Sequence, residues 1–168
     1  MPSLFVLGGV TALLTKALFE KRHSAMQFDK TGLDDYLTDE TLESEVGIWL
    51  KFPGGRRFRV LRAGGSNKKF LRALNSAIRP HKRAMDRGTM DMETSDEIMR
   101  TIYAKHVVVD WDGIKDAQGK KVPCTPENVA EFFKAFPNLF SDVTTLATDM
   151  AQFSEERIQE AKETLGEA

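Results

Sequence analysis

A helix start in the second half of the chain constrains the fold more than any other feature. Thr125 offers a hydroxyl cap, Pro126 fits the first helical position, and Glu127 places a carboxylate in the first turn. Apolar residues at helical spacing follow and stop before Pro137. The stretch therefore predicts an amphipathic helix that begins at residue 126.

A polar turn precedes this helix. Trp111 and Gly113 are flanked by three aspartates, and a large aromatic in such surroundings is expected to pack the turn onto the body of the protein. We predict an elbow in which Trp111 holds one helix against the next. Its residues would be Trp111, Asp112, Gly113, Pro123, Thr125 and Pro126.

Two alternating runs, GIWLKF and RFRVLRAG, predict a β-hairpin over residues 46–62, because a turn containing Pro53 and two glycines separates them. Ile48, Leu50 and Phe52 would share the apolar face, and arginines would dominate the other face together with Trp49.

The rest of the chain, residues 66–168, reads as mostly helical. Ser66 or Asn67 would cap the first helix, and Thr94 with Glu97 forms a plausible capping box for the next. The β-branched residues 107–109 fit either a strand or a continuation of that helix, and the apolar spacing favours the helix. The predicted class is α+β, mainly α: a hairpin followed by four to five amphipathic helices with a Trp-Asp-Gly elbow, all in a single domain over residues 26–168.

Residues 1–25 contain an apolar run of about 16 residues that includes Lys16, shorter than the roughly 20 needed to span a bilayer. The run also lacks the basic start and cleavage pattern of a signal peptide. It reads as a docking helix or as an extension upstream of a true start at Met26, and we favour the extension. No membrane association is expected.

Charge is unevenly distributed along the chain. Residues 1–50 have 4 Lys/Arg against 8 Asp/Glu, residues 51–87 have 12 against 1, and residues 88–168 have 8 against 16. A basic segment between two acidic ones is typical of nucleic-acid binding, or of parts that attract one another or a partner of mixed charge.

The sequence gives no support for an enzyme, a metal site or a cofactor. An EF-hand loop starting at Asp110 would fail at Ile114, Lys115 and Lys121. The three histidines have no zinc-like spacing, and the single Cys124 reads as a small buried side chain in a reducing cytoplasm.

The basic segment is the strongest functional feature among these residues. A hairpin plus helix carrying cations and Trp49 could follow phosphates and stack a base. A solvated basic face is the commoner outcome, so we rank a nucleic-acid-binding module as an alternative function. The predicted basic patch consists of Arg57, Arg59, Arg62, Lys68, Lys69 and Arg72.

Residues 58–164 resemble the tail assembly chaperones of long-tailed, siphovirus-like bacteriophages. The resemblance lies in FRVLRAGGSNKKFLRAL, in IYAKHVVVDWDGIKDAQGKKVPCTPENVAEFF and in FPNLFSDVTTLATDMAQF. Its most specific part is the Trp-Asp-Gly turn followed by the Thr-Pro-Glu-Asn helix start. The chain departs from the pattern at Cys124, where an aromatic often stands.

The resemblance implies a non-enzymatic protein of the host cytoplasm that is absent from the mature virion. It would bind the tape measure protein, keep it soluble and promote assembly of the tail tube around it. The tail tube protein and a frameshifted longer form of the chain are further partners implied by the resemblance. A structural tail or connector subunit is the remaining alternative, and it would be present in virions.

Apolar stripes on the last two helices are our predicted partner surface, because Phe- and Met-rich helices can repack against apolar partner helices. The surface would contain Phe140, Met150, Phe153 and Ile158.

Overall fold

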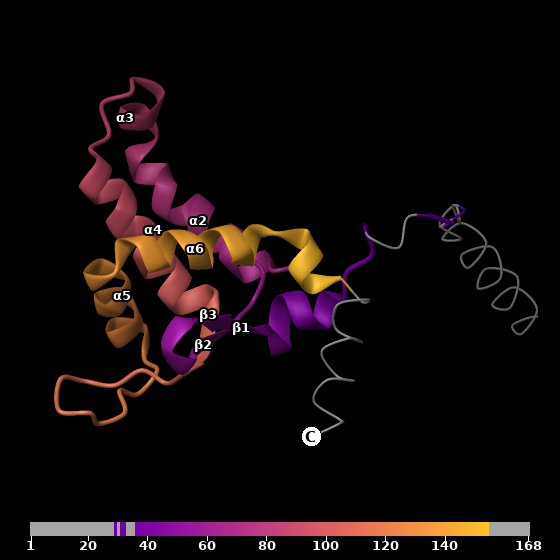
Figure 1. Ribbon diagram of the computed structural model, residues 1–168. Coiled ribbons are helices and arrows are strands. Elements are labelled where there is room, and N and C mark those ends of the chain that lie inside the picture. Colours follow the sequence, from indigo (N-terminus) through magenta and orange to yellow (C-terminus); the bar gives the residue numbers. More distant parts are fainter. Residues whose placement is uncertain (1–28, 30, 33–35, 155–168) are drawn as a thin grey trace, which may run out of the picture. The chain divides into compact units, whose positions relative to one another are not determined.

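A computed structural model describes residues 29, 31, 32 and 36–154 (Figure 1). The chain divides into two units, residues 1–32 and 33–168, and nearly all described residues belong to the second. The predicted extension or docking helix over residues 1–25 lies outside the described residues. The second unit is α+β and mainly helical, as predicted.

Three antiparallel strands form one sheet in the order β1-β2-β3. They are β1 (Ile48–Phe52), β2 (Arg56–Val60) and β3 (Val108–Asp112), and a short turn over Pro53–Gly55 joins the first two. Leu50 pairs with Phe58, and Phe58 pairs with Trp111, so these side chains lie on one buried face. Because side chains alternate along a strand, the opposite face carries the charged residues.

The third strand corrects our prediction that a helix continues to residue 109. Helix α4 (Met92–His106) ends at His106, and β3 starts at Val108. The β-branched run favours extended backbone, and β2 supplies the hydrogen-bonding partner that an isolated run lacks. Val109 lies at a bulge between the β2 positions Arg59 and Val60 and is 38% exposed, so its helical spacing from Ile102 was coincidental.

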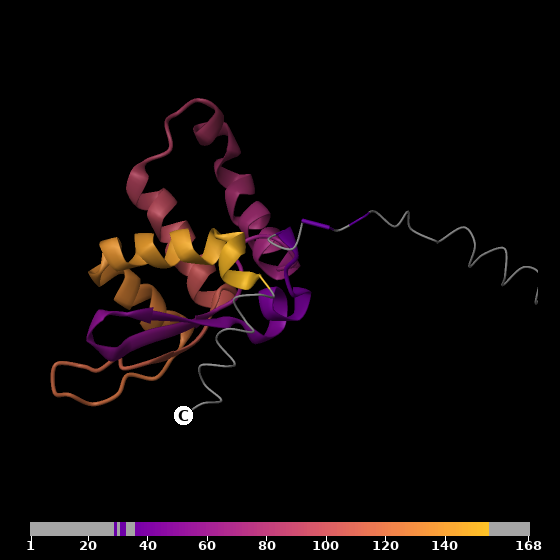
Figure 2. The same cartoon turned by 45° about the vertical axis from the view of Figure 1, so that its right-hand side comes forward.

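Helix α2 (Lys68–Ile78) and α4 run side by side, and the short α3 (Lys82–Asp86) lies at the end of this pair away from the sheet (Figures 1 and 2). Asn67 caps α2, since its side chain accepts a hydrogen bond from the backbone N–H of Phe70 at 3.2 Å. The predicted Thr94–Glu97 capping box is wrong. Asp91 caps α4 instead, and it accepts hydrogen bonds from both the N–H and the hydroxyl of Thr94.

Helix α5 (Pro126–Ala135) begins where the sequence predicts, with the Thr125 hydroxyl accepting a hydrogen bond from the N–H of Asn128 at 3.3 Å. Pro137 then opens α6 (Pro137–Thr148), and a single 3-10 turn follows over Met150–Phe153. The last predicted helix, which would contain Ile158, lies outside the described residues.

Aromatic rings connect the sheet to the helices through one continuous core. Phe58, which is fully buried, lies 5.9 Å from Phe133 of α5, and Phe133 lies 4.8 Å from Phe140 of α6. Phe140 meets Tyr103 of α4 at 5.4 Å, and Tyr103 meets Phe70 of α2 at 5.6 Å. Helices α2, α4, α5 and α6 therefore each contribute a ring to this series.

A buried ion pair connects the segment before β1 to the segment after β2. Glu43, in a π-helical turn over Leu42–Val46, is 1% exposed and bonds the guanidinium of Arg62. The backbone N–H of Ser66 donates to the same carboxylate at 2.7 Å. Asn67 extends the network, because its amide donates to the carbonyls of Arg62 and His106 at 2.9 and 3.0 Å.

Burial by itself would raise the pKa of Glu43, but hydrogen bonds from the Ser66 N–H, the Thr38 side chain and Arg62 outweigh it and hold the pKa below its ordinary value of 4.5. The stabilisation is therefore complete above pH 4.5 and is lost as the pH falls through the lower pKa of the folded state.

Glu43→Gln should lower the free energy of unfolding by about 2–3 kcal/mol at pH 7, because Arg62 loses its charged partner in a buried site. Urea denaturation followed by circular dichroism measures the change. The difference between the variant and the wild type should shrink below pH 4.5.

Asp110→Asn is the matched control. It removes the 3.9 Å ion pair of Asp110 with Arg59 on the solvated face, and should cost less than about 1 kcal/mol. Equal losses for the two variants, or a Glu43→Gln deficit that persists unchanged at pH 3, would contradict the assigned role of Glu43.

Candidate functional site

The solvated face of the sheet carries cations that the protein itself neutralises. Arg57 bonds Asp112 at 3.0 Å, and Arg59 lies 3.9 Å from Asp110. Both guanidinium groups stack over the ring of Trp49, at 4.9 and 5.8 Å from its centroid. The hydrogen bond from Arg57 is the main reason that the pKa of Asp112 lies below its ordinary value. Two arginines thus cover part of Trp49, which remains 40% exposed.

The six residues of the predicted basic patch therefore fall into two groups, three with acidic partners and three without any in the described part of the chain. Arg57 and Arg59 pair with aspartates of β3, and Arg62 pairs with the buried Glu43. The other three predicted members, Lys68, Lys69 and Arg72, lie exposed on α2. Sequence reasoning grouped the six because they are close in the chain, and it missed Glu43, which comes from a segment that looked weakly patterned.

Seven exposed cations occupy α2, α3 and the turns next to them, with Asp86 as the one acidic residue between residues 68 and 87. Within the described residues, none of the seven forms an ion pair. We call this surface the basic arm, and it consists of Lys68, Lys69, Arg72, Arg79, Lys82, Arg83 and Arg87.

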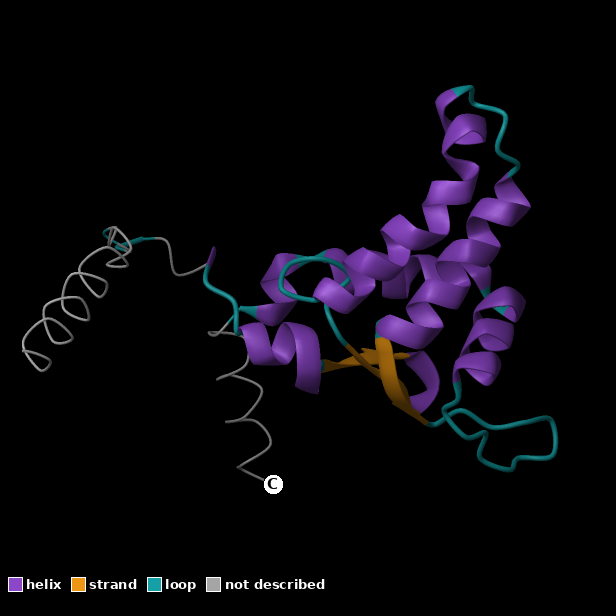
Figure 3. Ribbon diagram, turned by 180° about the vertical axis from the view of Figure 1, so that it is seen from behind, coloured by secondary structure: helices purple, strands orange, loops and turns teal. Residues whose placement is uncertain are grey.

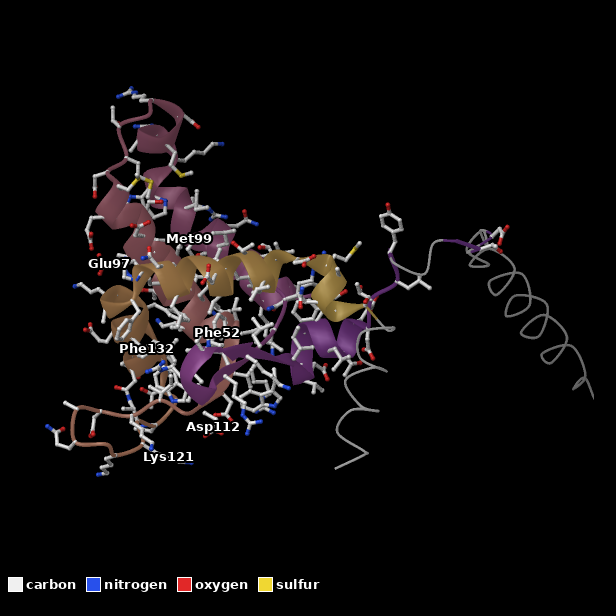
Figure 4. All side chains as sticks on the ribbon, viewed as in Figure 1. Phe52, Glu97, Met99, Asp112, Lys121 and Phe132 are labelled. Atoms are coloured by element: carbon white, nitrogen blue, oxygen red, sulfur yellow. The ribbon has the colours of Figure 1, made fainter. Side chains whose placement is uncertain are left out.

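The loop between β3 and α5 is fixed to the sheet by Trp111. The indole Nε1 donates to the carbonyl of Val122 at 2.8 Å, and the ring is 7% exposed between Phe58 and Phe132. The loop itself turns at Asp116, whose carboxylate accepts hydrogen bonds from two backbone N–H groups. Figure 3 shows this loop extending from the end of the sheet, and Figure 4 labels Asp112 and Lys121 at its base.

This arrangement corrects our picture of the elbow. Trp111 stands on a strand and holds the returning end of a loop, so it does not lock one helix against the next. Gly113 is required at the start of the loop. Its φ is +77°, and an added Cβ would lie 2.5 Å from the carbonyl oxygen of Gly55 in the turn between β1 and β2.

An open groove with a volume of about 1090 Å³ lies between this loop and α5. Trp111, Ile114 and Val122 line it from the strand and loop, while Phe132, Phe136 and Leu139 line it from the helices. Phe136 is 52% exposed, and its ring lies 4.8 Å from that of Phe132. We call it the Phe136 groove, and its polar lining includes Arg56, Lys115, Asp116, Asn128 and Glu131.

The predicted partner surface on the last helices is wrong for its two described phenylalanines. Phe153 is completely buried, and Phe140 packs between Tyr103 and Phe133. Met150 is half-buried, and Ile158 lies outside the described residues. The apolar stripe of α5 is the part of the sequence that could have identified Phe136. It is wider than the core needs, because Val129 and Phe133 fill the core and Phe136 remains for the groove.

In the part of the chain that the structure describes, no group of three His, Cys, Asp or Glu side chains is placed to hold a metal ion. Burial, with a smaller contribution from Asp110, raises the pKa of the Cys124 thiol to about 11, so the thiol is protonated at neutral pH. No helix among the described residues has the length and apolar character needed to cross a bilayer.

A family model described as YdaY prophage protein matches residues 65–164, more than half of the chain. The chain belongs to the YdaY prophage protein family. It is therefore a phage-derived protein. No curated protein and no solved structure matches it.

The range matched by the YdaY family contains most of the features described above. It includes the basic arm, β3, the loop held by Trp111, and helices α4, α5 and α6. The turn that contributes Gly54, Gly55 and Arg56 to the Phe136 groove lies outside it.

Trp111→Ala should lower the free energy of unfolding of this YdaY-family protein by about 3–5 kcal/mol. The substitution removes a buried ring that packs against Phe58 and Phe132 and bonds the loop at Val122. Trp111→Phe keeps a ring but loses the hydrogen bond to Val122, and should cost about 1–2 kcal/mol. Chemical denaturation of the purified variants measures both values.

Trp49→Ala is the matched control, since Trp49 is 40% exposed on the opposite face of the sheet. It should cost about 1 kcal/mol or less. A larger loss at Trp49 than at Trp111 would show that the loop is not held as described.

Proposed function

We propose that this YdaY-family protein is a phage tail assembly chaperone that binds and solubilises the tape measure protein. The observation that carries the proposal is the exposed ring of Phe136 beside Phe132 in an open groove that has both apolar and polar lining residues. A half-exposed phenylalanine on a groove of this kind is costly to leave in water, which favours a partner that covers it.

The occupant that fits best is an amphipathic helix of the partner. An apolar helix face docks into a hydrophobic groove through residues one helical turn apart, while polar residues at the rim fix its register. Here Phe132, Phe136 and Trp111 would receive the apolar side chains. Arg56 and Glu131, which have opposite charges, would select the polar residues that flank them.

Two further observations support a role in phage assembly. The family to which the chain belongs is a prophage family. The motifs that resemble tail assembly chaperones span residues 58–164, which nearly coincides with the family match at 65–164. Promotion of tail tube assembly, action in the host cytoplasm and absence from the mature virion are parts of the same proposal.

Phe136→Asp should abolish solubilisation of the tape measure protein without unfolding the chaperone, because the ring is 52% exposed. The measurement is co-expression with the tape measure protein of the same phage, followed by quantification of that protein in the soluble fraction. We expect at least a tenfold decrease relative to the wild type.

Met92→Asp is the matched control, since Met92 is 80% exposed at the start of α4 and does not line the groove. It should solubilise the tape measure protein as the wild type does. The proposal fails if the wild type leaves the tape measure protein insoluble or if both variants behave alike. Recovery of the protein from purified virions would favour a structural tail subunit instead.

A further inference from the structure

The chain contains a long stretch without a carboxylate. No Asp or Glu occurs from residue 46 to residue 85, a range that holds 11 Lys and Arg. Three of the five cations in its first part obtain partners from distant segments, because Glu43 reaches Arg62, and Asp110 and Asp112 reach two arginines of β2. The cations in its second part, the basic arm, obtain none among the described residues.

Two cations of the arm also lie where the dipole of α2 disfavours positive charge. Lys68 and Lys69 occupy the first turn of α2, where the positive end of the helix dipole disfavours cations, and this turn contains no acidic residue. Stability alone would select a carboxylate there. The arrangement instead concentrates positive charge at the exposed start of α2.

One residue of the arm, Lys69, also contributes to the electrostatics of a neighbouring side chain. His106, at the end of α4, has its pKa lowered first by burial and then by repulsion from Lys105 and Lys69. The carboxylates of α4 do not cancel the field of the arm by contact. Glu93 pairs with Arg100, neither Asp96 nor Glu97 forms an ion pair with the arm, and Glu97 lies on the side of α4 away from α2 (Figure 4).

The exposed face of α2 has the shape and chemistry of a helix that contacts duplex nucleic acid. Arg72 and Arg79 lie nearly two helical turns apart, with the exposed Asn75 and Ser76 between them. A helix of about 10–12 Å diameter fits the major groove, which is about 12 Å wide. Residues 68–87 contain a single Phe, Tyr or Trp, Phe70, and it is buried against Tyr103, so the arm offers none of these large rings for stacking a single-stranded base.

We propose that the basic arm binds the phosphate backbone of duplex nucleic acid, with the exposed face of α2 against the major groove. Lys68, Lys69 and the cations of α3 contact phosphates on either side, and binding depends little on base sequence. This activity is separate from the proposed chaperone function, because the Phe136 groove is lined by other elements.

The test is fluorescence anisotropy of the full-length protein with a labelled 25-base-pair DNA duplex at 50 and 200 mM salt. If five of the seven cations contact phosphates, the affinity should fall about 500-fold between the two salt concentrations. Arg72→Glu/Arg79→Glu should weaken binding at 50 mM salt by at least 100-fold, and Arg72→Gln/Arg79→Gln should weaken it by a smaller factor. Circular dichroism would establish that each variant is folded.

Lys115→Glu/Lys120→Glu is the matched control. It makes the same change in net charge on the exposed loop before α5, and should retain most of the affinity. Phe136→Asp should bind the duplex normally, so failure of the chaperone proposal is distinguishable from failure of this one.

The proposal would be overturned by no binding at 50 mM salt, by equal losses in the arm and loop variants, or by tighter binding of a poly-glutamate peptide than of the duplex. The last outcome would identify an acidic protein segment as the partner. Tighter binding of a single-stranded 25-mer would contradict the contact with a major groove.

Discussion

The contacts of Phe58 are the interaction on which the rest of the structure depends. Its ring is fully buried at the centre of the sheet and meets Phe52, Trp111, Phe132 and Phe133 within about 6 Å. These contacts bring together β1, β3 and α5, which are distant in sequence. Because Trp111 and Phe132 are held in this way, the loop before α5 and the Phe136 groove have a fixed floor, and any partner binds a preformed site.

A second constraint is the way in which carboxylates are distributed among the cations. Asp110, Asp112 and Glu43 pair with two arginines of β2 and with Arg62, and this pairing serves the fold. The basic arm lacks such partners within the described residues, and its charge is available for a ligand. The Phe136 groove and the basic arm are thus two separate surfaces, and they differ in the kind of partner that each can attract.

Local signals in the sequence predicted much of the fold. The start of α5 at Pro126 followed from a hydroxyl cap and a proline, and the apolar faces of β1 and β2 followed from alternation. The third strand was missed because residues 107–109 become a strand only through pairing with β2. The ion pair of Glu43 and the burial of Phe153 were missed for a related reason: both depend on segments that are far apart in the chain, which spacing along the sequence does not reveal.

Hydrogen–deuterium exchange on the co-purified complex with the tape measure protein tests the central claim most directly. The account predicts that the complex protects backbone amides of residues 113–122 and 131–139, which surround the Phe136 groove, and leaves residues 82–92 at the far end of the arm unchanged. Protection confined to the arm, or no change around the groove, would contradict it.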